Sequence, residues 1–371
     1  MQCIKHMRWF PYRIPFRTDF ITAHGILTAR EGAIVEIVTN DDLTGIGEIA
    51  PMPEFAGDDL RTALAPLPRL ASQLIGWELF DALDFLYADA DLPATMLCGV
   101  ESALLDVMGK SMGCGVMDAM GHTGAINRAR TVGRVPVNVV IGVLSIENTV
   151  ARAREAMHAG YSCIKLKVRG GHPDAEIERI AAVRAAIGPD MHLRLDANEG
   201  WTFAEAVAIL AQCASYAIQY VEQPLPAADL DGMHTLRYNV PVPIAADEAI
   251  YDMESARRVL AHDAAAVLII KPQLAGSLQV GRQIISEATQ HGVQCVITST
   301  IESGVGIAGA LHLAAASSEV TLECGLATLH LLADDLLIDD LILDHGFLAV
   351  PEGPGLGIHL DRNALAYYKR H

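Results

Sequence analysis

Basic residues are scarce in this sequence of 371 residues. It holds 27 Lys and Arg against 45 Asp and Glu, which gives a formal net charge of −18. Because the overall field of such a chain repels polyanions, we expect neither a nucleic acid nor an anionic membrane as a partner. A small anionic ligand is still allowed, since a local site can be positive on an acidic protein. The sequence leaves open whether the chain forms a homo-oligomer.

Long apolar runs and paired cysteines are also lacking. Charged residues occur within the first ten positions and no stretch is long and apolar enough for a span, so we expect no signal peptide and no membrane segment. The seven cysteines are scattered, and none forms a Cys-x-x-Cys pair. This pattern is typical of reduced, mostly buried thiols in a cytoplasmic protein, and it offers no zinc motif.

The N-terminal third combines strand and helix patterns. The chain is 51 % hydrophobic, and its length predicts one large domain and a smaller one. Residues 33–39 form an apolar, β-branched run, and polar residues at 40–42 separate it from a second run that ends at Gly47, which predicts a β-hairpin. Residues 60–112 are rich in Ala and Leu without strand alternation, which predicts helices. We therefore expect an α+β unit over residues 1–130.

From about residue 135, short apolar runs alternate with stretches of helical spacing. Residues 145–160 and 277–292 are two such stretches, and the second ends in His-Gly, as helices often do. Repeated strand–helix units predict a parallel sheet, and eight strands are the number that closes a barrel. An open, doubly wound sheet is the alternative. The eight apolar runs are residues 135–142, 163–168, 192–198, 218–224, 243–249, 265–273, 294–300 and 319–325.

Carboxylates stand at the ends of three successive runs. Asp196, Glu222 and Asp247 are 26 and 25 residues apart (222−196 and 247−222), one strand–helix unit each. In a barrel the carboxyl ends of the strands meet at one face, so the three side chains would converge. Converging carboxylates repel each other unless a cation lies between them, and oxygen ligands suit Mg²⁺ or Mn²⁺. The alternative is a structural ion network with nearby lysines.

Lysines flank this predicted metal site. Lys165 and Lys167 alternate in the run before the carboxylates, so they point the same way, and Lys271 ends the run after them. A lysine that is partly desolvated near other cations has a lowered pKa and can act as a base. A metal that binds a substrate carboxylate makes the neighbouring C–H more acidic. The sequence thus predicts metal-assisted proton abstraction next to a carboxylate.

The seventh run is followed by a glycine-rich stretch. Ser299 and Glu302 close the run, and Gly304, Gly306 and Gly309 then match Gly-x-Gly-x-x-Gly. Dinucleotide binding is disfavoured because the motif is not in a first βαβ unit and Glu302 would crowd a pyrophosphate. A turn with close helix packing is one alternative. We favour another, in which the N–H groups of the helix N-terminus hold a substrate carboxylate.

Taken together, the motifs resemble the enolase superfamily, in its muconate-lactonizing-enzyme branch, over nearly the whole chain. The resemblance implies an α/β fold, a (β/α)7β barrel (modified TIM barrel) over residues 131–330. An α+β capping domain would be formed by residues 1–130 and completed by about 331–371. The motifs are Lys165-Leu-Lys167, Leu195-Asp196-Ala-Asn198, Val221-Glu222-Gln-Pro224, Ala246-Asp247-Glu248 and Ile270-Lys271-Pro272.

The resemblance also implies roles for these residues. Asp196, Glu222 and Asp247 would bind Mg²⁺, with Mn²⁺ as a second choice. Lys167 would be the principal acid/base with Lys165 beside it, and Lys271 would face the other side of the substrate, a small anionic carboxylate. Asn198 and Glu248 would lie near the metal and Lys271. Substrate-binding or supporting roles are further expected for Ser299, Glu302 and Gly304.

Within the branch, three segments resemble the o-succinylbenzoate synthases. They are residues 47–57, residues 135–142 with Asn138, and residues 325–337 with 353–357. That family is made of carbon–oxygen lyases of menaquinone biosynthesis, which dehydrate a cyclohexadiene carboxylate through an enediolate. N-succinylamino acid racemases, cycloisomerases and dipeptide epimerases of the branch remain alternatives. Epimerases carry Asp-x-Asp after the last strand, where this chain has Gly325-Leu-Ala.

The resemblance assigns the choice of substrate to two parts of the expected capping domain. They are the loop around Thr18–Gly25 and the segment near Pro51–Phe55. Plain surface loops are the alternative for both. A non-catalytic barrel that kept the fold is the remaining alternative for the whole protein, and any metal-dependent turnover would exclude it.

Overall fold

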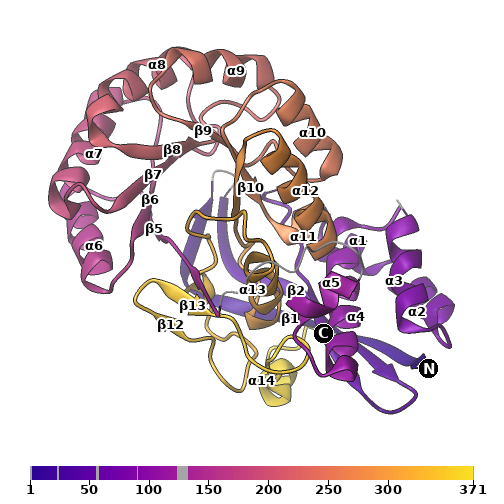
Figure 1. The fold of residues 1–371 in the computed structure, drawn as a ribbon. Helices are drawn as coiled ribbons and strands as arrows, with labels where there is room; N and C mark the ends of the chain where they lie inside the picture. The colour runs from indigo at the N-terminus through magenta and orange to yellow at the C-terminus, as the bar shows by residue number, and fades with distance from the viewer. Residues whose placement is uncertain (1, 23–24, 56–57, 90, 123–132, 371) are drawn as a thin grey trace.

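The computed structural model describes residues 2–22, 25–55, 58–89, 91–122 and 133–370. An N-terminal antiparallel sheet with its helices lies beside a ring of parallel strands, around which helices form an arc (Figure 1). No helix within the described ranges is both long and apolar enough to cross a membrane. The α+β unit and the barrel predicted from the sequence are thus both present.

The N-terminal sheet has three strands in the order β1-β2-β3. The predicted hairpin is confirmed, because β2 and β3 pair antiparallel from Val38↔Thr44 to Ala33↔Ile49. The strand β1 was not predicted. It lies at the edge of the sheet, where its prolines are tolerated because only isolated bridges form on its outer side. Thr18 and Gly25, expected in a loop, lie in β1 and β2; residues 23–24 fall outside the described residues. The strands are β1 (Ile4–Thr22), β2 (Gly25–Thr39) and β3 (Thr44–Ile49).

The predicted helices of residues 60–112 are also confirmed, and one of them supports the sheet at very short range. Helix α4 is buried along almost its whole length. A Cβ added to Gly47 of β3 would lie 2.0 Å from the carbonyl oxygen of Gly99 in α4, so only glycine allows this approach. The contact holds β3 close against α4. The helices are α1 (Leu60–Leu64), α2 (Leu67–Leu74), α3 (Leu79–Ala88), α4 (Ala94–Met112) and α5 (Val116–His122).

Seven parallel strands follow one another in space in the order of the chain. Their sheet runs β5-β6-β7-β8-β9-β10-β11, which excludes the doubly wound alternative because that topology changes direction. The strands are β5 (Val139–Ile141), β6 (Cys163–Lys167), β7 (His192–Asp196), β8 (Ile218–Glu222), β9 (Ile244–Ala246), β10 (Val267–Ile270) and β11 (Gln294–Ile297).

The eighth run closes the ring. Cys324 forms a parallel bridge to Val137, and Gly325 forms one to Thr298, so this segment joins the two ends of the sheet. All eight predicted runs therefore lie in the barrel, as a (β/α)7β arrangement. The connecting helices are α6 (Ile146–His158), α7 (Pro173–Ile187), α8 (Phe203–Gln212), α9 (Leu230–Asn239), α10 (Met253–Ala261), α11 (Pro272–Ala275), α12 (Leu278–Gln290) and α13 (Gly304–Ala315), with a 3₁₀ turn η1 (Cys213–Tyr216).

The C-terminal tail contacts both parts of the molecule. Leu332 and Lys369 form bridges to Phe16 and Tyr12 of β1. The hairpin of β12 and β13 instead pairs with β4, the strand that leads into the barrel. The remaining elements are β4 (Arg134–Pro136), η2 (Leu329–Leu331), β12 (Leu343–Asp344), β13 (Phe347–Ala349) and α14 (Arg362–Tyr367).

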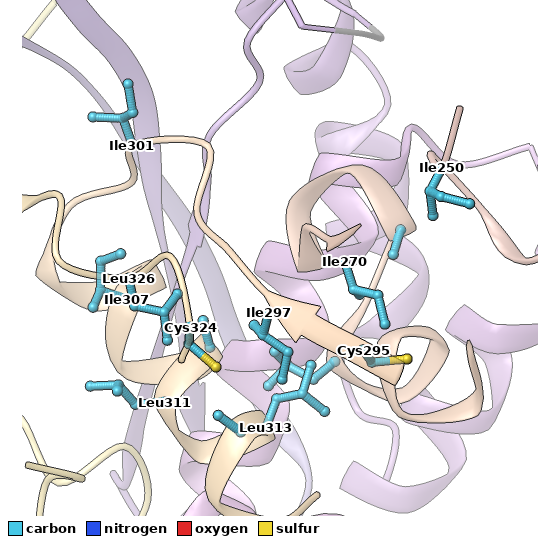
Figure 2. Close-up of a cluster of buried hydrophobic side chains, with 14 of the residues drawn as sticks. Ile250, Ile270, Cys295, Ile297, Ile301, Ile307, Leu311, Leu313, Cys324 and Leu326 are labelled. Atoms are coloured by element: carbon cyan, nitrogen blue, oxygen red, sulfur yellow. The ribbon is translucent and has the colours of Figure 1, made fainter. Parts of the chain in front are cut away.

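The barrel interior is filled by side chains rather than open. An apolar cluster inside the ring forms the floor beneath the carboxyl ends of the strands, with Tyr220, Ala245, Val267, Ile269 and Val296 as members. On the outer face, Ile270 of β10 and Ile297 of β11 belong to the same buried apolar cluster as Leu311 and Leu313 of α13, and Figure 2 shows part of this cluster. Inner and outer side chains alternate because successive residues of a strand point to opposite faces of the sheet.

Arg194 lies at the opposite end of the barrel interior and is fully buried. Its guanidinium donates to Glu323 Oε2 over 2.8 Å and to Gln219 Oε1 over 2.5 Å. It also donates to the Oδ1 of Asn138 over 3.3 Å. Asn138, one of the residues on which the synthase resemblance depends, therefore helps to close the barrel here.

One buried histidine predicts an acid sensitivity of the fold. His312 of α13 is fully buried; its Nε2 lies 3.2 Å from the Leu356 carbonyl oxygen, and its Nδ1 has no partner among the residues that the structure describes. Burial lowers the pKa of His312 to about 4, below its ordinary 6.5. The unfolded chain therefore binds this proton first, and stability should fall by about 3 kcal/mol as pH drops from 6.5 to 4.

The substitution His312→Asn should remove this part of the pH dependence. Urea unfolding at pH 7 and pH 4.5 measures it as a smaller loss of stability on acidification than in the wild type. The same substitution at the exposed His291 serves as the control and should keep the wild-type difference. An unchanged difference in His312→Asn would show that another group causes the acid sensitivity.

Candidate active site

The three predicted carboxylates converge at the carboxyl ends of neighbouring strands. Asp196 ends β7, Glu222 ends β8, and Asp247 follows β9 directly. Asp196 and Glu222 face each other in the strand register. The three residues are 1 %, 1 % and 4 % exposed, which is costly for carboxylates unless each has a partner.

Two lysines of β6 supply part of that compensation. Lys165 Nζ lies 2.8 Å from Glu222 Oε1 and 3.0 Å from Asp196 Oδ2. Lys167 Nζ lies 2.7 Å from the same Asp196 oxygen and 2.6 Å from Asn198 Oδ1. Their side chains point to the same side of the strand, as the alternation of the sequence predicts. Lys167 is the more accessible, since 32 % of its side chain is exposed against 12 % for Lys165.

The third lysine approaches from the other side of the carboxylates. Lys271 follows β10, and its Nζ donates to Asp247 Oδ1 over 2.6 Å. The ring of Phe55, from the N-terminal part of the chain, lies 4.9 Å from this Nζ in a cation–π contact. Only 9 % of the Lys271 side chain is exposed. The lysines thus flank the carboxylates, and the one on the β10 side is covered.

The loops that follow β7 and β8 hold the carboxylates in place through unusual backbone conformations. Asn198 and Gln223 both adopt positive φ, at 42° and 36°. Asn198 donates its N–H to Asp196 Oδ1 over 3.2 Å and its amide to Glu248 Oε1 over 2.9 Å. Gln223 Oε1 accepts the N–H of Asp247 over 2.9 Å. Gln223 was not predicted, although the pattern Val-Glu-Gln-Pro around it could have suggested a role.

The charges of the site are unevenly balanced. Burial pushes the pKa of Asp196 upward, but the ion pairs with Lys165 and Lys167 outweigh it and hold the pKa below its ordinary value. Burial and the charge of Asp196 raise the pKa of Glu222 to about 8, against the opposing effect of Lys165. Burial, Asp247 and Asp196 raise the pKa of Glu248 to about 7. The site therefore carries more negative charge than its lysines neutralise.

The lysines differ from the sequence prediction in one respect. A lowered pKa was expected, and burial does act in that direction on Lys165 and Lys271. The attraction of the neighbouring carboxylates is larger, however, and raises the pKa of both lysines. Asp196 and Glu222 cause this at Lys165, and Asp247 and Glu248 cause it at Lys271. The prediction considered the effect of the neighbouring lysines on these pKa values and gave too little weight to the neighbouring carboxylates.

The donor set fits a cation that prefers oxygen. Glu222 Oε2 and Glu248 Oε2 are buried and have no hydrogen-bond partner within the described ranges, which is rare for carboxylate oxygens. Within the part of the chain that the structure describes, no three His, Cys, Asp or Glu side chains are already grouped at metal-binding spacing. The oxygens of Asp196 and Glu222 are instead contacted by lysine ammonium groups. Carboxylates without sulfur or imidazole suit Mg²⁺ or Mn²⁺ better than zinc.

The N-terminus of α13 differs from the interpretation favoured from the sequence. A carboxylate does lie there, but it belongs to Glu48 of β3, which accepts the N–H groups of Ser303 over 2.9 Å and Gly306 over 2.8 Å. The N–H of Gly304 donates to the Asp335 carbonyl oxygen over 2.8 Å. These N–H groups are therefore already used by the protein. The sequence could not show it, because Glu48 is more than 250 residues away in the chain.

Ser299 and Glu302 are buried in the turn that precedes α13. Ser299 Oγ accepts the N–H of Ile301 over 3.2 Å and lies 2.9 Å from Thr328 Oγ1. Both oxygens of Glu302 accept the N–H of Thr300 at 3.0 Å. Burial raises the pKa of Glu302 in spite of these bonds. The contacts show both residues shaping this turn, and their expected contact with substrate stays a prediction.

A family model described as Enolase C-terminal domain-like matches residues 148–364, more than half of the chain. A second, described as MenC, N-terminal domain, matches residues 4–79. The chain belongs to the enolase superfamily. The family resemblance predicted from the motifs is thereby confirmed, including the muconate-lactonizing-enzyme branch. As a member of this superfamily, the protein is an enzyme with a capped modified TIM barrel.

Relatives of this superfamily enzyme carry different activities. It is 37 % identical to the o-succinylbenzoate synthase of Thermobifida fusca, over 58 % of this chain and 66 % of that protein. It is 27 % identical to the N-succinyl-L-Arg/Lys racemase of Bacillus cereus, over 96 % and 95 %. A solved dipeptide epimerase of Enterococcus faecalis, complexed with Mg and the dipeptide L-Leu-L-Tyr, matches with a TM-score of 0.87 at 27 % identity, covering 96 % and 99 %.

Proposed function

We propose that this enzyme is an o-succinylbenzoate synthase, a Mg²⁺-dependent carbon–oxygen lyase. Its substrate would be 2-succinyl-6-hydroxy-2,4-cyclohexadiene-1-carboxylate. The observation that carries the proposal is the asymmetry of the two lysines that flank the carboxylates. Lys167 is a third exposed, whereas Lys271 is nearly buried between Asp247 and the ring of Phe55. A dehydration needs one lysine that moves a proton, while a racemisation needs two.

We assign the metal to Asp196, Glu222 and Asp247. Two features of Glu222 support this: one of its oxygens lacks a partner among the described residues, and its pKa is raised. A bound cation would contact that oxygen and favour the charged carboxylate. When bound, the ion would neutralise the substrate carboxylate and make the adjacent C–H more acidic. The ion would also compete with the lysines for the carboxylates. Asn198, itself bonded to Glu248, would keep the Asp196 carboxylate in place.

In the proposed reaction Lys167 acts twice on one face of the ring. Its neutral amine removes the proton from the carbon next to the carboxylate, and the electrons of that C–H bond form the enediolate. The enediolate then collapses to a ring double bond as the C–O bond to the hydroxyl group breaks. The Lys167 ammonium returns the proton to this hydroxyl, so that water leaves. Lys271 stays protonated and stabilises the enediolate by its charge.

The barrel wall opposite the carboxylates argues against a dipeptide substrate. Gly325 of the eighth segment stands where the epimerases carry the first Asp of their Asp-x-Asp. A Cβ at position 325 would lie 2.9 Å from the Cβ of Thr298 and 2.7 Å from its Oγ1. An aspartate cannot be placed there unless the backbone shifts. The resemblance of residues 4–79 to the MenC N-terminal domain also favours the synthase.

The second candidate is an N-succinylamino acid racemase. It is favoured by the presence of a lysine on each side of the carboxylates and by the similarity to the Bacillus cereus racemase over nearly the whole chain. A muconate-type cycloisomerase would use the same lysines and metal ligands. No residue of the site separates these reactions by its chemistry alone.

The test is a direct assay of the purified protein with Mg²⁺. We expect the cyclohexadiene substrate to be converted to o-succinylbenzoate at a rate far above that of the Lys167→Ala variant. A panel of N-succinylamino acids in D₂O is the parallel experiment, with deuterium at the α-carbon as its readout. Conversion no faster than in Lys167→Ala would exclude the synthase, and deuterium incorporation in its place would establish the racemase.

A further inference from the structure

Glu48 brings a negative charge from the N-terminal part of the chain to the barrel. It is 1 % exposed, and its Oε1 accepts the Ser303 N–H over 2.9 Å while its Oε2 accepts the Ser303 hydroxyl over 2.6 Å and the Gly306 N–H over 2.8 Å. Tyr12 of β1 donates a further hydrogen bond to Oε1. A carboxylate at a helix N-terminus is stabilised by the free N–H groups and the helix dipole.

The chain that follows Glu48, here called the capping segment (residues 48–55), is held by two more buried side chains. Gln273 donates to the Glu48 carbonyl oxygen over 2.8 Å and accepts the Ala50 N–H over 3.0 Å. Arg30 donates to the carbonyl oxygens of Ala50 and Pro51 at 2.5 Å. The capping segment is thus bonded to α11, which follows β10, and to the N-terminus of α13, which follows β11.

The turn on which Glu48 acts is strained. Ile301 adopts φ of 63°, an uncommon conformation for a β-branched residue. Its carbonyl oxygen accepts from Arg30 over 3.0 Å, and its N–H donates to Ser299 Oγ. Strain of this kind persists only where the surroundings determine the conformation, and Glu48 supplies part of these surroundings at Ser303.

The capping segment ends at the active site. Phe55, seven residues after Glu48, places its ring 4.9 Å from Lys271 Nζ. Gln273, which binds the start of the segment, lies two residues after Lys271 in the chain. Bonds at Glu48 and Gln273 therefore fix both the ring and the lysine backbone on one side of the site.

We propose that Glu48 is a positioning residue for Lys271, acting through the capping segment and Phe55. The inference rests on the proposed function only in taking Lys271 as a group that faces the substrate. Loss of the Glu48 carboxylate would release the segment from α13 and let the Phe55 ring move away from the ammonium group. A misplacement of about 1 Å can lower a rate by about 10²-fold.

Glu101 offers a matched control at the same contact between the two parts of the molecule. It is fully buried in α4, and its carboxylate accepts the N–H groups of Leu278 over 2.6 Å and Gln279 over 3.1 Å at the N-terminus of α12. It therefore makes the same kind of bond to the neighbouring barrel helix. Its partners lie outside the capping segment and the turn before α13.

The experiment compares Glu48→Ala, Glu48→Gln and Glu101→Gln in D₂O with the two enantiomers of an N-succinylamino acid. The Lys167→Ala and Lys271→Ala variants show which enantiomer presents its α-proton to which lysine. We expect Glu48→Ala to slow exchange on the Lys271 side by about 10²-fold and on the Lys167 side by less than about 3-fold. Glu48→Gln keeps one acceptor and should recover part of the rate, and Glu101→Gln should change both sides equally.

An equal loss on both sides in Glu48→Ala, or no loss on either, would overturn the proposal. Crystal structures of Glu48→Ala and Glu101→Gln provide a second measurement, which needs no turnover. A displaced Phe55 ring only in Glu48→Ala is expected, and an unchanged contact with Lys271 in that variant would also overturn the proposal. Absence of exchange and of dehydration in the wild type would instead count against the proposed function, and the crystal structures would still decide the role of Glu48.

Discussion

Replacing Lys167 with alanine is expected to lower kcat for the dehydration by about 10⁴-fold while leaving Mg²⁺ binding nearly unchanged. The large loss follows from the double use of this side chain, which removes the α-proton and returns it to the departing hydroxyl. Its ammonium group contacts Asp196 and Asn198, and no other lysine of the described part of the chain is bonded to both. Steady-state kinetics measure the loss, and calorimetric titration with Mg²⁺ measures the retained binding.

Lys110 is a close match for a control. Its Nζ lies 2.7 Å from Asp106 and its side chain is 27 % exposed, almost the values of Lys167 with Asp196. Lys110→Ala leaves a buried carboxylate without its ion pair and should destabilise the fold, yet the folded fraction should keep its full kcat. Comparable kcat losses in the two variants would refute the assignment of Lys167 as the acid/base.

Replacing Glu222 with glutamine is expected to stabilise the metal-free protein at pH 8 and to abolish its stabilisation by Mg²⁺. Because the pKa of Glu222 is raised to about 8 from its ordinary 4.5, the folded protein keeps a proton that the unfolded chain releases. The stability from this group is fully present below pH 4.5 and is lost as pH rises through 8. Removing the charge should recover on the order of 1–3 kcal/mol at pH 8 and little at pH 4.5.

Thermal unfolding with EDTA and with Mg²⁺ separates the two effects. A ligand at 100 times its Kd stabilises the folded state by about 2.7 kcal/mol, so the Tm of the wild type should rise on adding Mg²⁺. Glu222→Gln should show no such rise. Glu101→Gln, which removes another buried carboxylate with a pKa raised by burial to about 7, should keep it in full. A normal response of Glu222→Gln to Mg²⁺ would rule out Glu222 as a ligand.

The parts of the site that the sequence could predict are those that follow from strand order. Each barrel strand places its last residues at the same face, so Asp196, Glu222 and Lys271 could be grouped from their spacing alone. The lysines of β6 followed from simple alternation. The edge strand β1 was missed because it contains prolines, which are uncommon in strands. Its pairing with β2 is visible only in the folded structure.

Other parts could not be predicted because they depend on contacts between distant segments. The approach of Glu48 to α13 and of Phe55 to Lys271 joins residues more than 200 positions apart. The raised pKa of Lys271 depends on how closely Asp247 and Glu248 approach it, which spacing does not determine. The substrate is the least predictable part, because the relatives that this chain resembles include both a racemase and a synthase.

The tight contact between Gly325 and Thr298 limits how this protein can change over time. A substitution at 325 made first would meet the side chain of Thr298 and harm the fold before any new activity could be selected. If position 298 first lost its side chain, position 325 would be free to vary. The order of the two mutations therefore matters, and a descendant with an acidic residue at 325 is expected to carry glycine at 298.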